Sequence, residues 1–457
     1  MSRVFLLSSN VSTEPYPVYP LGMAVVAGAL AGSGHQVRQF DFLAEERSEQ
    51  RLTEAVREFA PDFVCLSLRN IDNVDSLCAE GGWYLEQARR LVACLRTETA
   101  VPVILGGPAF SILPEEILDF VGGDHGIVGE GERAACELID ALAAGKAAGR
   151  IIAGGAPLAG GEMTAPLLEE KLVDFYLRGS GMLNLQTKRG CPHACAYCTY
   201  PHLEGKDFRP RDPREVADDL ERMTREHGVD HVFFTDSVFN DPRGHYLEVA
   251  EELIRRELKL NWCGYFRPQG LGRAELALLK RSGLSAVELG TDAACDRTLA
   301  GLDKGFSFAE VLEVNRACLE EKVPCAHFVI FGGPGETTET LQEGLENMER
   351  LGPAVVFAFS GIRILQGAPI HQRAVADGVI APDAPLLRPV YYFSPGVDSE
   401  QMNAAIEAAF AGRRDRIFPP SEGQARLSVM QRFGYRGLLW DKLISFDKGS
   451  RRRAGGA

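Results

Sequence analysis

The sequence predicts an α/β protein with a doubly wound parallel sheet, a partial β/α barrel and a small C-terminal extension. Three observations predict this fold. In residues 1–150 short apolar runs alternate with amphipathic stretches, which is typical of parallel strands joined by helices. Residues 181–380 repeat the alternation in six strand–helix units, fewer than the eight that close a full barrel. Residues 151–180 contain a run of small residues with proline, which indicates a flexible linker.

The elements of the first part follow from their apolar pattern and their end signals. The expected helix 20–30 begins at Pro20 and ends before Gly32 and Gly34, which are ordinary start and stop signals. The expected strands are 4–7, 37–42, 63–68 and 101–107, and the expected helices are 20–30, 52–59, 83–95 and 134–144. Sheets of this class bind their ligands beyond the carboxyl ends of the strands.

The second part is justified in the same way. The expected helix 213–227 carries Val216, Leu220 and Met223 on one face, as a helix packed on a sheet does. The expected strands are 182–186, 231–234, 261–266, 286–290, 325–331 and 354–359, and the expected helices are 213–227, 246–258, 274–282, 308–322 and 338–351. We expect the extension, residues 381–457, to close the open side of the partial barrel and to shape the substrate pocket.

Composition and charge exclude several functions. The 457 residues carry a net charge of −14, which argues against a surface that binds nucleic-acid phosphates. The chain lacks a stretch of about eighteen apolar residues, so we expect no membrane span, and the run 4–7 is too short for a signal peptide. Eight of the eleven cysteines are scattered, most of them in apolar runs, which favours free thiols in a reducing cytoplasm.

The chemistry of the sequence centres on three cysteines. Cys191, Cys195 and Cys198 follow a C-x3-C-x2-C spacing in a loop that leaves an apolar, strand-like run. Three thiolates can hold three irons of a cubic [4Fe–4S] cluster and leave the fourth iron open, whereas four cysteines close every iron. An open coordination position is what a metal site needs to bind a substrate. A zinc site is the alternative, with His193 or His202 as its fourth ligand.

This motif, with Tyr197 before the last cysteine, resembles that of the radical S-adenosylmethionine (radical SAM) superfamily. The resemblance implies that the open iron binds SAM, with Tyr197 next to the cofactor site. It also implies that an electron from the cluster cleaves SAM to a 5′-deoxyadenosyl radical. An electron donor such as flavodoxin or ferredoxin is then an expected partner. The six strand–helix units are similar to the partial (β/α)6 barrel of these enzymes.

The resemblance also gives roles to polar residues at expected strand ends. Glu288 would contact the ribose of SAM, and Asp236 would contact its amino group. The stretch 331–336 is similar to the family's glycine motif along the adenine. Its candidate residues are Gly332, Gly333, Gly335 and Glu336. Each carboxylate also has a plainer interpretation, because Glu336 and Asp236 can cap the following segments and Glu288 can form a salt bridge.

Four other residues of the second part are candidates. Arg267 and Arg363 follow expected strands, where either could pair with a carboxylate of SAM or of the substrate. Lys304 lies in a Lys-Gly-Phe sequence that is similar to a pattern of related radical SAM enzymes. His327 is a candidate proton carrier, although a single His in an apolar run is more often structural.

The first part resembles the cobalamin-binding domain that precedes the barrel in one radical SAM subfamily. The resemblance rests on the stretch 16–22, on Ser67, and on Gly106 and Gly107, whose size lets a bulky ligand approach the backbone. The family's D-x-H-x-x-G motif, whose His ligates cobalt, is absent, since residues 8–12 are Ser-Ser-Asn-Val-Ser. Either cobalamin binds without a protein ligand, or the domain is a degenerate remnant.

Two polar stretches of the first part keep two interpretations each. Residues 69–76 form either a capped turn or a lid that contacts cofactor or substrate near the domain interface. Glu130 and Glu132 either stabilise the N-terminus of the following helix or belong to the site.

The resemblance implies a cobalamin-dependent enzyme that methylates an unactivated carbon. In this mechanism the SAM-derived radical takes a hydrogen, methylcobalamin donates a methyl group, and a second SAM remethylates cobalt. The alternatives are a cobalamin-binding radical SAM enzyme that forms or rearranges a ring without methylation, and a zinc-binding protein without enzymatic activity. A small molecule, a lipid or a natural product would serve as the substrate, and the sequence does not choose among them.

Overall fold

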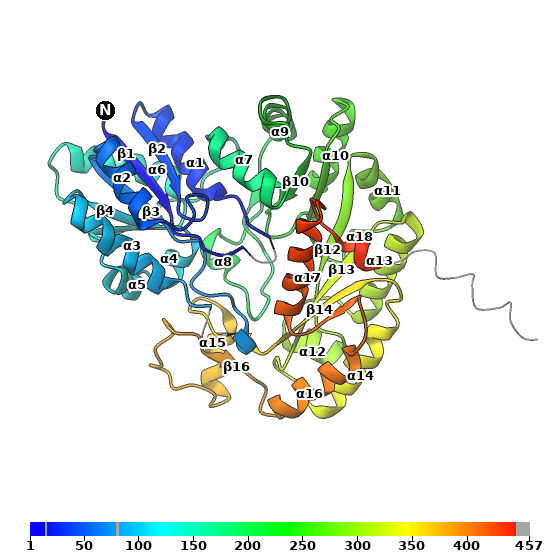
Figure 1. Ribbon diagram of the computed structural model, residues 1–457. Helices are drawn as coiled ribbons and strands as arrows, with labels where there is room; N and C mark the ends of the chain where they lie inside the picture. The colour runs from blue at the N-terminus through cyan, green and yellow to red at the C-terminus, as the bar shows by residue number, and fades with distance from the viewer. Residues whose placement is uncertain (14–15, 79–81, 445–457) are drawn as a thin grey trace, which may run out of the picture.

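The structure is a computed structural model that describes residues 1–13, 16–78 and 82–444. Two parallel sheets lie side by side, with helices on their outer faces (Figure 1). The blue to cyan part of the chain forms the first sheet, and the green to yellow part forms most of the second. The predicted fold class is therefore confirmed.

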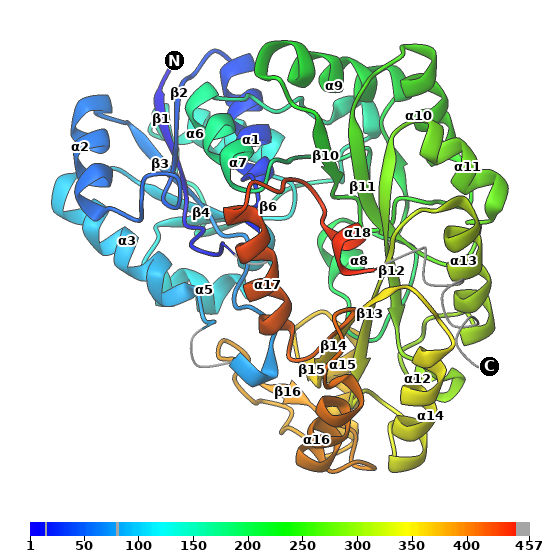
Figure 2. The same ribbon diagram turned by 45° about the vertical axis from the view of Figure 1, so that its right-hand side comes forward.

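The first sheet has the strand order β2-β1-β3-β4-β5-β6 and is parallel throughout. Its strands are β1 (Arg3–Ser8), β2 (Gln36–Asp41), β3 (Phe63–Ser67), β4 (Val103–Gly106), β5 (His125–Val128) and β6 (Ile151–Ala153). Helices α1 (Leu21–Gly32) and α6 (Gly131–Ala143) cover one face, and α2 (Glu49–Phe59), α3 (Leu85–Glu98) and α5 (Pro114–Val121) cover the other (Figure 2). Helices on both faces explain why the central strands are nearly continuous apolar runs.

The strand register brings the predicted cofactor contacts of the first sheet to one edge. Ser8 lies beside Ser67, and Ser67 lies beside Gly106, at the carboxyl ends of β1, β3 and β4. The strand order reverses between β1 and β3, and such a switch point is where open α/β sheets bind their ligands.

The second sheet has the order β17-β14-β13-β12-β11-β10-β7 and remains open between its end strands. Six of its strands match the predicted ones: β7 (Leu183–Leu185), β10 (His231–Phe234), β11 (Asn261–Phe266), β12 (Leu284–Asp292), β13 (Cys325–Phe331) and β14 (Val355–Ser360). The seventh, β17 (Arg416–Ile417), comes from the expected C-terminal extension and pairs in parallel with β14.

The outer helices of the barrel have clear start and stop signals. Helix α9 (Pro213–His227) begins after Asp212, whose side chain accepts a hydrogen bond from the Arg214 amide, and ends at Gly228 with φ of 67°. The other outer helices are α10 (His245–Arg255), α11 (Arg273–Arg281), α13 (Phe308–Glu321) and α14 (Thr338–Glu349). None of the described helices combines the length and the apolar character that crossing a membrane requires.

The C-terminal segment covers the concave side of the second sheet. Helices α17 (Pro420–Arg432) and α18 (Trp440–Leu443) lie between the two sheets in Figure 2. Leu427, Leu439 and Trp440 belong to a separate apolar cluster with residues of β12, β13 and β14. The segment packs against the barrel interior because that face is apolar and has no strands to close it.

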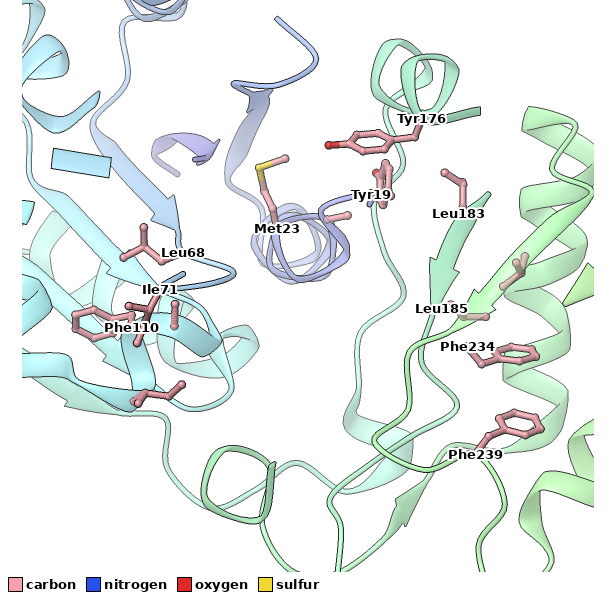
Figure 3. Packing of buried hydrophobic residues seen from close by; sticks show 14 of the residues in the cluster. Tyr19, Met23, Leu68, Ile71, Phe110, Tyr176, Leu183, Leu185, Phe234 and Phe239 are labelled. Atoms are coloured by element: carbon pink, nitrogen blue, oxygen red, sulfur yellow. The ribbon is translucent and has the colours of Figure 1, made fainter. Parts of the chain in front are cut away.

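The expected linker contains ordered elements. It supplies β6 to the first sheet and helix α7 (Glu170–Gly179), which leads directly to β7. Figure 3 shows Tyr176 of α7 against Tyr19 of the first part, and their ring centroids are 5.5 Å apart. The Tyr176 hydroxyl donates to Asp41 Oδ1 at 3.2 Å. These contacts continue one apolar cluster from the first sheet into the barrel.

Candidate functional site

The three cysteines lie on a loop that is fixed at both ends. Cys191 and Cys195 are buried and Cys198 is half-buried. Gly190, which precedes them, has φ of 86°, and a Cβ there would lie 2.0 Å from the Asp207 carbonyl oxygen. The Ala196 amide donates to the Leu302 carbonyl at 2.9 Å. The loop therefore keeps one shape because close backbone contacts leave little room for another.

Two cations face one of the thiols. Lys304 Nζ lies 3.5 Å and Arg267 Nη1 lies 3.8 Å from Cys195 Sγ, and all three residues are buried. Burial raises the pKa of Cys198 to about 12 and also raises that of Cys191, while Lys304 and Arg267 respectively oppose these shifts. Positive charge beside sulfur favours the thiolate that binds iron. Arg267 was predicted to pair with a carboxylate of SAM or of the substrate, but it lies beside Cys195 Sγ together with the site candidate Lys304.

Asp292 is a site residue that the sequence analysis missed. It ends β12 with φ of 57°, accepts a hydrogen bond from the Tyr197 hydroxyl at 2.6 Å, and pairs with Lys304. The signal was present, because Asp292 is an acidic residue at the carboxyl end of the fourth barrel strand, where barrels build their sites. The predicted strand ended at residue 290, so Glu288 was predicted as the acidic site residue, whereas the strand continues to Asp292.

Glu288 lies in the middle of β12, four residues before the strand end, and not at the mouth of the barrel. The Trp440 indole donates to its Oε1 at 3.2 Å, so the partner comes from the C-terminal segment and not from a basic residue. Burial raises the pKa of Glu288 to about 8. This location does not favour the predicted contact with the ribose of SAM. The alternative, a salt bridge, is also absent, since no basic side chain among the described residues pairs with Glu288.

Asp236 is occupied by the chain itself. It is fully buried and accepts hydrogen bonds from the Thr187 amide at 2.7 Å and from Lys188 Nζ at 3.2 Å. The Thr187 hydroxyl also donates to it. These partners hold the strand that enters the cysteine loop, and they do not favour the predicted contact with the amino group of SAM.

The glycine motif follows β13 as expected, but its acid is structural. Glu336 accepts hydrogen bonds from the Gly332 amide at 3.3 Å and from the Thr340 hydroxyl at 2.6 Å. The Ser394 amide donates to the Gly332 carbonyl at 2.8 Å, so the C-terminal segment also holds this turn. An adenine contact by Gly332, Gly333 and Gly335 stays a prediction.

His327 has a structural role. Its ring nitrogens lie 2.8 Å from the Thr291 hydroxyl and 3.0 Å from Asn315 Oδ1. Burial lowers its pKa to about 3, so the ring stays neutral near pH 7 and is a poor proton carrier there.

The carboxyl edge of the first sheet is shaped for a bulky ligand. A Cβ on Gly106 would meet nothing nearer than 4.0 Å, whereas one on Gly107, with φ of 98°, would lie 2.5 Å from the Leu68 carbonyl oxygen. Ser67 is half-buried beside them. Small residues at this edge leave room for the predicted cobalamin. The loop after β1 offers Ser9 and Asn10 and no His, so it presents no side chain of the kind that ligates cobalt.

The zinc alternative finds no support in the side-chain geometry. In the residues that the structure describes, no group of three His, Cys, Asp or Glu side chains is placed to hold a single ion. A cubic cluster needs a wider spacing of the thiolates, because each cysteine binds a different iron.

Comparison with known proteins agrees with this geometry. Residues 185–347 match the radical SAM superfamily, and residues 8–139 match the B12 binding domain. The chain therefore contains a radical SAM domain and a B12 binding domain. The two matches also confirm the predicted cofactor classes, which are a [4Fe–4S] cluster, SAM and cobalamin.

Relatives of this chain include enzymes of two reaction types. Tryptophan 2-C-methyltransferase of Streptomyces laurentii is 26% identical over 428 residues, which cover 76% of this chain and 71% of that enzyme. Anaerobic magnesium-protoporphyrin IX monomethyl ester cyclase of Cereibacter sphaeroides is 28% identical over 351 residues and covers 71% of this chain, which spans about half of that enzyme (55%).

A solved structure shares the whole fold. The radical SAM methyltransferase TsrM of Kitasatospora setae, solved with cobalamin and a [4Fe–4S] cluster bound, superposes with a TM-score of 0.82. It is 22% identical, and the superposition covers 96% of each chain. This likeness establishes the common arrangement of the two sheets.

Largely buried ion pairs join the two domains next to the cysteine loop. Arg189 lies 3.2 Å from Glu130 and 2.6 Å from Glu132, and Arg209 lies 2.7 Å from Glu130. Both acids follow β5 at the carboxyl edge of the first sheet, and Arg189 stands two residues before Cys191. Glu130 and Glu132 therefore belong to the domain interface, where the sequence analysis left two interpretations open.

A second ion pair joins the domains through the loop after β3. Asp72 Oδ2 lies 2.7 Å from Arg363 Nε, and both side chains are almost fully buried. Arg363 was predicted to face the barrel mouth and to pair there with a carboxylate of SAM or of the substrate. Its guanidinium instead pairs with Asp72 of the first domain. The loop 69–76 lies at the domain interface, and the side chains of Asp72 and Asn73 accept hydrogen bonds from backbone amides of the same loop, as the capped-turn interpretation expected. A contact of this loop with cofactor or substrate stays a prediction.

Proposed function

We propose that this protein is a cobalamin-dependent radical SAM enzyme that methylates a carbon atom of a small molecule. One observation carries the proposal: the cobalamin edge of the first sheet is joined to the cysteine loop by the contacts of Glu130 with Arg189. Both cofactors would then open on the same interior space. The relatedness to a tryptophan 2-C-methyltransferase supports methyl transfer to carbon.

Residues of both domains would bind the cofactors. Cys191, Cys195 and Cys198 would hold the cluster, and Lys304 and Arg267 would stabilise the bound Cys195 thiolate. When bound, the cluster would supply an electron, SAM would supply the methyl group, and cobalamin would carry that methyl group. Ser67, Gly106 and Gly107 would leave the space that the corrinoid needs.

The domain interface would exclude water from the reaction. The largely buried ion pairs of Glu130 with Arg189 and of Asp72 with Arg363 close this interface next to the cysteine loop. A closed space of this kind strengthens electrostatic interactions and protects reactive species. A flavodoxin or ferredoxin would serve as the electron donor, and a reducing cytoplasm would suit the free thiols.

A second candidate function follows from the cyclase relative. That enzyme's name describes ring formation, so a cobalamin-binding radical SAM enzyme without methyl transfer is the alternative. The two functions differ in whether the methyl group of SAM appears in the product.

The proposal is tested with anaerobically purified, cluster-reconstituted protein that is offered hydroxocobalamin and SAM with a deuterated methyl group. We expect near-stoichiometric corrinoid after gel filtration and deuterated methylcobalamin in the mass spectrum under reducing conditions. A Cys195→Ala variant should keep the corrinoid and lose the cluster absorbance. Retention of corrinoid without any methylcobalamin would favour the ring-forming alternative, and loss of corrinoid with an intact cluster would end the proposal.

A further inference from the structure

The C-terminal segment fills only part of the concave face of the barrel sheet. Tyr265 lies on β11, a central strand, and is still 42% exposed. Its neighbours Trp262 and Phe266 point the other way and pack against Phe239 under the outer helices. Tyr200, which follows the cysteine loop, is 39% exposed. Exposure on the inner side of a central strand means that open space remains inside the barrel.

Glu288 points a carboxyl group into this part of the barrel. It lies directly beside Tyr265 in the register of β11 and β12, and only 3% of its surface is exposed. Oε1 accepts the Trp440 hydrogen bond at 3.2 Å. Oε2 has no hydrogen-bond partner among the described residues. It is also not fully enclosed by protein atoms, so a ligand can reach it. A nearly buried carboxyl group therefore keeps one free oxygen on the interior space.

Aromatic side chains lie near the Glu288 carboxyl group. Trp440 is held against Phe357 with the ring centroids 5.1 Å apart, and Phe357 stacks on Phe328 at 5.3 Å. Burial raises the pKa of the phenols of Tyr16, from the loop before α1, and of Tyr265, and nearby Glu288 adds to both shifts when it is ionised. Rings from the first domain, the barrel and the C-terminal segment thus converge on one carboxyl group.

The charges around Glu288 determine its protonation. Burial raises its pKa to about 8, so near pH 7 the carboxyl is neutral and can donate one hydrogen bond. The titratable groups that face it are Tyr16, Tyr265 and Cys263, all of which are neutral at that pH. Arg69, which acts on both tyrosines, adds positive charge and disfavours a cationic ligand.

We infer that Glu288 and Trp440 form a recognition site for the substrate, and that this site takes the neutral, hydrogen-bond-accepting edge of an aromatic or heteroaromatic group. The inference rests on the proposed function for the identity of the pocket as a substrate site. Trp440 fixes the carboxyl by occupying Oε1, so that the other oxygen presents its proton to the ligand. The aromatic rings supply the faces against which a flat ligand packs.

The test uses two flat probes of nearly equal shape, 7-azaindole and indole. Only 7-azaindole has a ring nitrogen that accepts a hydrogen bond, and both are neutral at pH 7. Binding to the cluster-reconstituted full chain is measured by saturation-transfer NMR and by Trp fluorescence. We expect 7-azaindole to bind at least fivefold more tightly than indole at pH 7, and we expect the preference to fade above pH 8 as Glu288 loses its proton.

Variants separate this site from general hydrophobic binding. Glu288→Leu should abolish the preference, Trp440→Phe should weaken it, and Glu251→Leu at an exposed helix position should leave it unchanged. If Glu288→Leu fails to fold, the pH series on the unchanged protein and the Trp440→Phe variant decide. Equal affinities for the two probes at pH 7, or a preference for benzylamine at pH 7, would overturn the inference. The probes need neither SAM nor cobalamin, so this result is independent of whether methyl transfer occurs.

Discussion

The charges of Lys304 and Asp292 lie next to the cysteine loop and should influence the reduction potential of a bound cluster. Lys304 donates to Cys195 Sγ and at the same time pairs with Asp292, which bonds Tyr197. Hydrogen bonds to the sulfurs and net local charge are two of the factors that set the potential of an iron–sulfur cluster. The acid therefore moderates the effect of the lysine, and the two side chains should shift the cluster in opposite directions.

Replacing Lys304 by Met should make the midpoint potential of the reconstituted cluster more negative by roughly 60 mV, about a tenfold change in a one-electron equilibrium. Asp292→Asn, which leaves the lysine on Cys195, should shift the potential upward. Lys146→Met, at an exposed position, is the control. The measurement is an EPR-monitored redox titration, and equal potentials in all three variants would contradict the assignment of Lys304 to the cluster.

Glu288 should make stability depend on pH. Its pKa is about 8 in the folded chain and 4.5 in the absence of the fold, so the folded state retains a proton that the unfolded state releases. The stabilising contribution is present below pH 4.5 and is lost as the pH rises toward 8. Between pH 6 and 8.5 the free energy of unfolding should fall by about 3 kcal/mol through this residue.

Urea denaturation of the wild-type chain and of Glu288→Gln at both pH values measures this contribution. The amide does not titrate, so the loss of stability should be smaller in the variant by that amount. The same pH dependence in both proteins would show that Glu288 is already ionised in the folded state.

At the scale of elements, short segments connect the two sheets. Arg189 precedes the cysteine loop and meets Glu132, which is 5% exposed at the start of α6. Breaking a buried ion pair on one side leaves an unpaired charge, which is more costly than the loss of an exposed pair.

We therefore expect Arg189→Met to destabilise the protein by about 3 kcal/mol. Arg225→Met, which removes an exposed pair with Glu226, should change stability by less than about 0.5 kcal/mol. Chemical denaturation gives both values. The Arg189→Met variant should also retain less corrinoid after gel filtration, because the carboxyl edge of the first sheet loses its ion pair with the cysteine loop. Full retention of corrinoid would argue against a positioning role of Arg189.

At the scale of the whole molecule, the two domains share one apolar cluster. Figure 3 shows it passing from Leu68 and Phe110 through Tyr19 and Tyr176 to Leu183 and Phe234. A continuous core couples the unfolding of its parts, because exposing one part removes contacts from the other.

The chain should accordingly unfold in one transition, with equal midpoints for amides of the first sheet and of the barrel. Tyr176→Ala, which empties a fully buried position, should lower stability by about 3 to 5 kcal/mol and separate the two midpoints. Hydrogen exchange in increasing urea, followed by mass spectrometry, reports both domains at once. Two midpoints in the wild-type chain would contradict the coupling.

Much of this architecture was predictable because it is encoded locally. The six predicted barrel strands are present. The C-x3-C-x2-C spacing predicts that the loop of Cys191, Cys195 and Cys198 carries the cluster. The seventh strand β17 escaped prediction because two residues give no periodicity. Asp292 escaped because its importance depends on Lys304 and Tyr197, which only the fold brings to it.

The fold class and the presence of a radical SAM domain could be predicted from the sequence, since apolar periodicity and motif spacing act over short stretches of chain. Tertiary structure alone decided which polar groups meet. Asp72 with Arg363, Glu132 with Arg189 and Glu288 with Trp440 are far apart in sequence. The physical reason is that a buried charge or carboxyl group needs a partner in space, and the packing of the two sheets selects that partner.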